Sequence, residues 1–125
     1  MISFFEKYNW ISWVFVFLIL SVIFYFSSLQ YDPVPKIGFP LKAVIYHLGI
    51  FSLLNGFLMI ALSKGEKLDW IFFAFLFSFF YAFFDEFHQT FIPGRSAGFF
   101  DIFIDGIGIL YSLMFYLIVI EWRKR

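Results

Sequence analysis

Residues Tyr81 to Leu110 read YAFFDEFHQTFIPGRSAGFFDIFIDGIGIL, and this stretch decides how the rest of the chain is interpreted. It places ionisable and amide side chains inside or beside some of the most apolar sequence of the protein, namely Asp85, Glu86, His88, Gln89, Arg95, Asp101 and Asp105. A charged side chain at the centre of a bilayer costs about 2.5–3.5 kcal/mol on insertion scales. A group of such residues therefore indicates either partners within the protein or a function.

The composition is typical of an integral membrane protein. Of the 125 residues, 62% are hydrophobic, 23 are phenylalanine and only 14% are charged, whereas soluble domains are close to half apolar and one quarter charged. Four apolar runs are long enough to cross a bilayer, since a helical span needs about 20 residues. The sequence therefore predicts an all-α fold, a four-helix transmembrane bundle with short loops, as a single domain over residues 1–125.

The expected spans cover residues 8–29, 41–62, 70–90 and 99–121. The segment from Tyr31 to Pro40 carries three prolines and must be a loop, and Pro93 with Gly94 predicts a turn between the last two spans. The first span is too long for a cleavable signal peptide, so we expect it to remain in the protein. The chain contains no cysteine, which excludes disulfides and thiolate metal sites.

Basic residues near the span ends predict the orientation of the bundle. The side with both termini carries Lys7, Lys64, Lys67, Arg123, Lys124 and Arg125, and the opposite side carries Lys36, Lys42 and Arg95. Cytoplasmic loops are enriched in Lys and Arg, so six residues against three predict cytoplasmic termini and an extracellular Arg95 turn.

Helical geometry predicts that the polar residues gather at one level. With a rise of about 1.5 Å per residue, His47, Asp85 and Asp105 lie roughly 7–9 Å from the outer ends of their spans. Spacings of three and four residues form one stripe from Ser78, Tyr81, Asp85, His88 and Gln89, and another from Asp101, Asp105, Gly108 and Ser112. We expect an inward-facing polar pocket that opens outward, with Arg95 at its mouth. Ser27, Ser28 and Gln30 either join this cluster or simply end the first span.

Several chemistries suit this set of residues. His88 with Asp85 or Glu86 suits general acid–base catalysis, and the four acidic residues with the two histidines offer ligands for a divalent cation. The guanidinium of Arg95 suits a carboxylate or a phosphate. The alternative is a structural network that holds four thin helices together. No HExxH, P-loop, GxSxG or paired CxxC motif is present, so the residues specify no reaction, no required cofactor and no particular metal.

These motifs resemble the VanZ-like family. That family is recognised by a D-E-x-x-Q core, a P-G-R turn and D-x-x-x-(N or D)-x-x-G in the last span, which read DEFHQTFIPGR from Asp85 to Arg95 and DIFIDGIG from Asp101 to Gly108. Two further motifs of the family, F-x-x-S-S and an early second-span histidine, match residues 24–28 and His47. The acidic residue and tyrosine that often follow this histidine are replaced by isoleucine and phenylalanine.

The resemblance implies a multi-pass protein of the bacterial cell membrane, whose family namesake is associated with low-level teicoplanin resistance. The leading hypothesis is an envelope protein that binds an anionic lipid, a cell-wall precursor or a (lipo)glycopeptide through His47, Asp85, Glu86, His88, Gln89, Arg95, Asp101 and Asp105. A membrane-embedded hydrolase or transferase that uses His88 with Asp85 or Glu86, with or without a metal, is the alternative, and an ion-coupled carrier is a third. The lipid bilayer is the expected partner, and no nucleic acid is expected.

Overall fold

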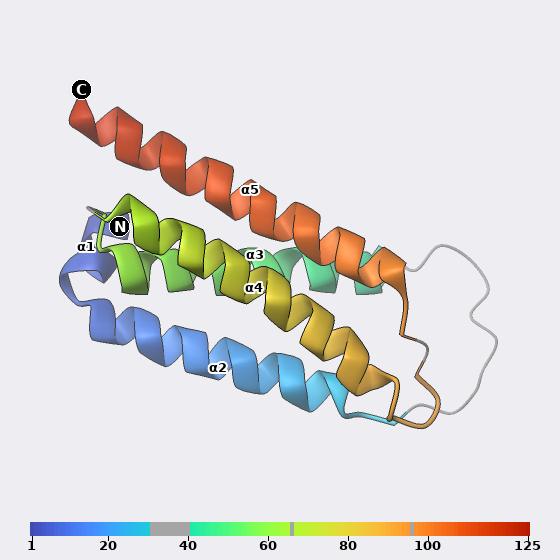
Figure 1. Ribbon diagram of the computed structural model, residues 1–125. Coiled ribbons are helices and arrows are strands. Elements are labelled where there is room, and N and C mark those ends of the chain that lie inside the picture. Colours follow the sequence, from blue (N-terminus) through green and yellow to red (C-terminus); the bar gives the residue numbers. More distant parts are fainter. Residues whose placement is uncertain (31–40, 66, 96) are drawn as a thin grey trace.

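The computed structural model describes residues 1–30, 41–65, 67–95 and 97–125 and shows an all-α protein, as the sequence predicts. The helices are α1 (Ile2–Lys7), α2 (Asn9–Ser27), α3 (Leu41–Ser63), α4 (Leu68–Gln89) and α5 (Phe99–Lys124) (Figure 1). The predicted proline-rich loop at residues 31–40 lies outside the described residues.

The four long helices are each apolar and long enough to cross a membrane, so the chain is a multi-pass membrane protein embedded in the lipid bilayer. Their bounds agree with the predicted spans to within three residues. The short helix α1 is not predicted. It is separated from α2 by Tyr8, whose backbone (φ −108°, ψ 56°) is not helical.

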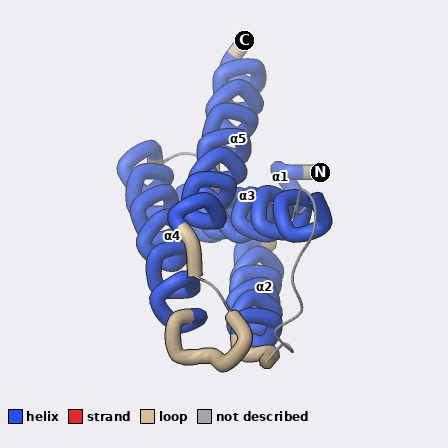
Figure 2. The backbone as a smooth tube through the Cα atoms, turned by 90° about the vertical axis from the view of Figure 1, so that its right-hand side faces the viewer, coloured by secondary structure: helices blue, strands red, loops and turns tan. Residues whose placement is uncertain are grey.

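Helix α3 is the centre of the bundle. It packs against α1, α2, α4 and α5, whereas α2 and α5 do not pack against each other among the described helices. Figure 2 shows α2 and α5 on opposite sides of α3. Both termini and the α3–α4 turn lie at one end of the bundle, where Figure 1 also places α1.

The inward face of α4 is small and polar, and its outward face is aromatic. Its buried residues are Ile71, Ala74, Ser78, Ala82, Asp85, Glu86 and Gln89, which recur at helical spacing. Large side chains such as Phe80 (74% exposed) and Phe87 (62%) point outward. In water such a surface would be an aggregation or interaction patch, but lipid tails solvate it. The helix is therefore built for a bilayer on one side and for polar contacts on the other.

Helices α3 and α5 approach each other closely at Gly108. A Cβ atom built on this glycine would lie 2.4 Å from the carbonyl oxygen of Leu48, so no larger residue fits without moving a backbone. Small residues at helix interfaces in membranes permit such close packing. The predicted stripe of small and polar residues on α5 is confirmed as an α3-facing surface at this position.

Asn55 joins three helices in the middle of the bundle. Its Nδ2 donates to the carbonyl oxygen of Ile109 (3.1 Å) and to Oγ of Ser112 (2.8 Å), and Ser78 donates to its Oδ1 (3.3 Å). Asn55 is fully buried, and unsatisfied polar groups are costly in a hydrocarbon environment. These contacts therefore fix how α3, α4 and α5 rotate relative to one another.

Candidate functional site

The end of the bundle away from the termini gathers most of the predicted site residues, and we call it the polar end. It consists of the last turn of α2, the first two turns of α3, the last two turns of α4, the following turn and the first two turns of α5. Asp85, Glu86, Gln89, His47 and Asp105 are all buried there. Asp101, His88 and Arg95 are partly exposed.

A cavity of about 560 Å³ opens at the polar end between α2, α3 and α4. Its polar lining consists of Ser27, Lys42, Tyr46, His47, Asp85, Gln89 and Arg95, and its apolar lining of Ile23, Phe26 and Ala43. The residues predicted to share one pocket do not all line this cavity. His47, Asp85, Gln89 and Arg95 line it, whereas Glu86, His88, Asp101 and Asp105 do not. A second cavity, of about 230 Å³ near α1, has a mostly apolar lining and offers few groups for recognition.

His47 and Asp105 form a buried pair between α3 and α5. Nδ1 of His47 lies 2.9 Å from Oδ1 of Asp105, and Asp105 has no exposed surface. An ionised carboxylate only accepts hydrogen bonds, so Nδ1 is the donor. The pair fixes the orientation of the imidazole, which forms part of the cavity wall.

Gln89 connects the two acidic residues of α4. Its Nε2 donates to Oδ2 of Asp85 (3.0 Å) and to Oε1 of Glu86 (3.3 Å). The other oxygen of Glu86 accepts from the backbone N–H of Gly98 (2.9 Å), which is the residue before α5. Glu86 therefore ties the end of α4 to the start of α5, and Asp85 on the adjacent face reaches the cavity.

Arg95 joins the α4–α5 turn to the end of α2. Its Nε donates to the carbonyl oxygen of Leu29 (3.3 Å), and its Nη2 donates to that of Phe26. Helix C-termini leave unpaired carbonyl groups and a partial negative charge, so a guanidinium suits this position. Arg95 lines the cavity, as the sequence predicts for the mouth of the pocket, and it also has this anchoring contact.

His88 lies apart from the acidic residues. Its Nε2 lies 3.0 Å from Oγ of Ser28, and its ring stacks on Phe24 with a centroid distance of 4.9 Å. No carboxylate of the described residues bonds to it, and it does not line the cavity. The contacts therefore do not favour the pairing of His88 with Asp85 or Glu86. Of the three polar residues that end the first span, Ser27 lines the cavity, Ser28 contacts His88 and Gln30 is exposed.

Three potential metal ligands also meet at the polar end. One atom from each of His47, Glu86 and Asp101 lies within 4.8 Å of the others. These residues come from α3, α4 and α5. The sequence identifies all three as candidates, but spacing along single helices cannot group them.

Two residues of the cavity wall, Lys42 and Tyr46, are not singled out by the sequence pattern, although both lie within one or two turns of His47 along α3.

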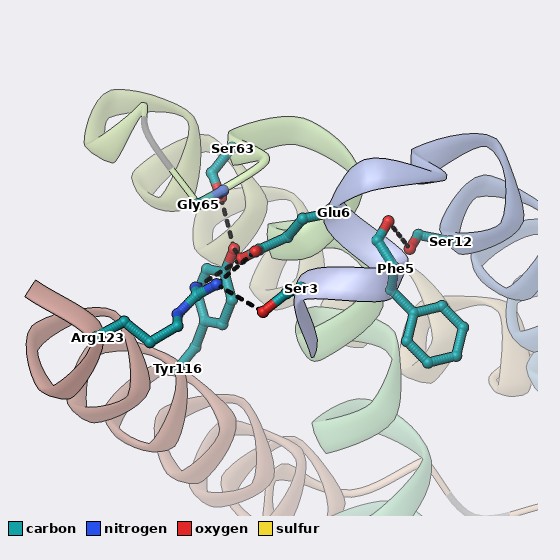
Figure 3. A network of polar contacts seen from close by, with 8 residues as sticks. All are labelled: Ser3, Phe5, Glu6, Ser12, Ser63, Gly65, Tyr116 and Arg123. Atoms are coloured by element: carbon teal, nitrogen blue, oxygen red, sulfur yellow. Dashed lines mark hydrogen bonds and ion pairs between the residues drawn. The ribbon is translucent and has the colours of Figure 1, made fainter. Parts of the chain in front are cut away.

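The opposite end of the bundle holds a second polar network (Figure 3). Arg123 donates from Nη1 to Oε2 of Glu6 (2.6 Å) and from Nη2 to Oε1 (2.8 Å), and Tyr116 donates to Oε1 (2.9 Å). The hydrogen bonds from Arg123 hold the pKa of Glu6 below its usual value, although partial burial opposes them. The oxygens of Ser63 and Tyr116 lie 2.9 Å apart. This network ties α1 to α5, and the sequence offers no signal for it beyond a basic C-terminal tail.

A protein-family model described as VanZ/LLP1 matches residues 6–120 of the chain. The match covers α2, α3 and α4 completely and α5 up to Ile120, so it includes every candidate residue of the polar end but not Arg123. No curated protein and no solved structure matches the chain.

Proposed function

The chain belongs to the VanZ/LLP1 family, and from this premise we propose that it binds a phosphate-bearing envelope lipid or lipid-linked cell-wall precursor in the cavity at its polar end. The observation that carries the proposal is the composition of that cavity. Two cationic side chains, Lys42 and Arg95, share it with hydrogen-bonding groups and with the apolar Ile23 and Phe26. Such a lining suits an anionic headgroup together with the start of an acyl or polyprenyl chain.

The cations have different parts in this proposal. Lys42 is exposed at the start of α3 and makes no hydrogen bond or ion pair to a described residue, so its ammonium is available to a phosphate in this proposal. Arg95 contacts the end of α2 through Nε and Nη2 and also lines the cavity, where its guanidinium suits a phosphate. Electrostatic attraction to anionic lipid contributes about 1 kcal/mol for each Lys or Arg near the membrane surface.

The remaining polar groups suit the uncharged parts of a headgroup. Asp85 is a hydrogen-bond acceptor for hydroxyl or amine groups, and Gln89 holds it in place. Tyr46 and Ser27 add hydroxyls to the same wall. Phospholipids with polar headgroups and lipid-linked sugar precursors have this chemistry, and a lipoglycopeptide such as teicoplanin shares the combination of anionic, hydroxyl and acyl groups. The link to teicoplanin resistance that the family resemblance implies is part of this proposal.

The experiment is a comparison of lipid retention and binding in mild detergent. Lipids that co-purify with the wild-type protein are identified by mass spectrometry, and affinities are measured for a short-chain anionic phospholipid, a short-chain polyprenyl phosphate and teicoplanin. Lys42→Glu is expected to weaken binding at least about tenfold, or 1.4 kcal/mol. Lys64→Glu is the matched control, because Lys64 is exposed and directly follows the last residue of α3, whereas Lys42 lies at its start.

The three ligands separate the sources of the shared chemistry. Tight binding of polyprenyl phosphate alone identifies the precursor, and binding of teicoplanin alone identifies the antibiotic. Equal binding by the wild type, Lys42→Glu and Lys64→Glu for all three ligands contradicts the proposal, because the cavity then takes no part in recognition.

A further inference from the structure

Four carboxyl groups lie at the polar end, more than at any other place among the described residues. Asp85, Glu86 and Asp105 are buried, and Asp101 is partly exposed beside them. The carboxylate of Asp105 is paired only with His47, and its Oδ2 is buried with no hydrogen-bond partner among the described residues. A buried carboxylate without compensation is unfavourable by several kcal/mol. A buried carboxylate oxygen without a described partner, beside three further carboxyl groups, suits the binding of a cation.

The side chains that could hold a cation come together from three helices. Ligand atoms of His47, Glu86 and Asp101 lie within 4.8 Å of one another. Two ligands that share one divalent ion lie up to about 4 Å apart, given metal–ligand distances of about 2.0–2.2 Å. Small side-chain rotations therefore bring all three onto one ion. We infer that His47, Glu86 and Asp101 form a binding site for a divalent transition metal, of the zinc or manganese type.

The surrounding contacts orient these three ligands. Asp105 accepts the Nδ1 proton of His47, which leaves Nε2 with its lone pair as the ligand atom. Nε2 has no hydrogen-bond partner among the described residues, although the His47 side chain is only 8% exposed. A carboxylate behind a metal-binding histidine is the arrangement that fixes the tautomer and raises the basicity of the ligand.

Hydrogen bonds also orient Glu86, and Asp101 is available as the third metal ligand. Gln89 and the backbone N–H of Gly98 hold the two carboxylate oxygens of Glu86. Asp101 lies in the first turn of α5 and makes no side-chain hydrogen bond to a described residue. One imidazole and two carboxylates suit zinc or manganese more than magnesium, because imidazole favours transition metals. Three protein ligands leave room for a water or for a ligand from the cavity, whose wall includes His47.

Metal binding is tested directly, without any lipid ligand. Protein without an affinity tag is stripped with chelator in detergent, and Co²⁺ and Zn²⁺ are titrated while visible absorption and the thermal unfolding midpoint are recorded. The wild type is expected to bind about one equivalent of metal per chain and to unfold at a higher temperature with it, because a ligand that binds only the folded state stabilises it.

Asp101→Asn is the decisive variant, because Asp101 has no described hydrogen bond to lose and the fold should persist. It is expected to bind metal at least about tenfold more weakly, and Asp105→Asn about 10–100-fold more weakly through its contact with His47. His88→Gln removes the other histidine and serves as the matched control, with unchanged binding. Absence of stoichiometric binding by the wild type overturns the inference, and so does equal affinity for the wild type and Asp101→Asn.

The result is independent of lipid recognition. Lys42→Glu is expected to retain full metal affinity, because Lys42 is not one of the three ligands. Loss of lipid binding with normal metal binding in this variant supports both proposals. Normal lipid binding by metal-free protein leaves the proposed function in place and assigns the metal a structural part in joining α3, α4 and α5.

Discussion

Nδ1 of His47 and Oδ1 of Asp105 lie 2.9 Å apart between α3 and α5, and neither side chain is more than 8% exposed. The pair links two helices that are far apart in the sequence. It also holds His47 in the wall of the cavity at the polar end. The contact therefore contributes both to the packing of α3 against α5 and to the wall of the proposed binding cavity.

Removal of the imidazole should destabilise the bundle. His47→Ala leaves the Asp105 carboxylate buried without its partner, and breaking a buried pair in this way costs about 3–5 kcal/mol. Asp105→Asn keeps the shape and one acceptor, so it should cost less. Unfolding in mild detergent measures both, and Ser21→Ala, at an exposed position of α2, is the control. If His47→Ala unfolds at the same midpoint as the wild type, the contact between His47 and Asp105 does not stabilise the bundle.

Gly108→Ala should destabilise the protein, whereas Gly56→Ala should not. The added Cβ at residue 108 would meet the Leu48 carbonyl oxygen at 2.4 Å, but the Cβ at residue 56 would have nothing within 4 Å. Overpacking typically costs about 1–3 kcal/mol, and Gly to Ala at an open helical site is neutral or stabilising by about 0.5–1 kcal/mol. Thermal unfolding of both variants in one detergent decides this, and equal midpoints contradict the close approach of α3 and α5.

Acidification should weaken the network at the end of the bundle that carries the termini. Hydrogen bonds from Arg123 lower the pKa of Glu6 below its ordinary value of 4.5. The ionised Glu6 therefore contributes its full stabilisation above pH 4.5, and this contribution is lost as the pH falls through the folded-state pKa. The difference in unfolding midpoint between the wild type and Glu6→Gln should shrink below that pH. A difference that stays constant down to pH 3 or so contradicts the assignment.

Arg95→Ala should lower stability and ligand binding together, and Lys42→Ala should lower ligand binding alone. Arg95 donates to carbonyl groups at the end of α2, and a hydrogen bond from a charged donor is worth about 1.5–3 kcal/mol. Arg95→Lys keeps the charge but not the planar fork, so it should restore only part of the stability. Both properties are measured on the same preparations. Normal stability of Arg95→Ala means that water replaces these contacts.

The bundle should be inserted with its termini in the cytoplasm and the Arg95 turn outside, as the positive-inside rule predicts. Since the chain contains no cysteine, Ala97→Cys and Lys124→Cys each introduce one reporter. An impermeant thiol reagent should label residue 97 in intact cells and residue 124 only after lysis. The reverse labelling pattern establishes the opposite orientation.

The sequence by itself determined the four membrane-spanning helices and the polar faces of the last two. Length and hydrophobicity set the spans, and a period of 3.6 residues sets which side chains share a face, as for Ser78, Asp85 and Gln89 on α4. Both properties are local, so they can be predicted without knowledge of the packing. The prediction that His47, Asp85 and Asp105 lie at the same end of the bundle follows from the same local geometry.

Only the tertiary structure decided which of these residues meet. His47 pairs with Asp105 and His88 with Ser28, whereas the sequence suggests Asp85 or Glu86 as the partner of His88. Each choice depends on how α3 is rotated against its neighbours, and this rotation is fixed by the contact of Gly108 with Leu48 and by the bonds of Asn55. Helical spacing determines positions along one helix, but pairing across helices depends on packing between segments that are more than 50 residues apart.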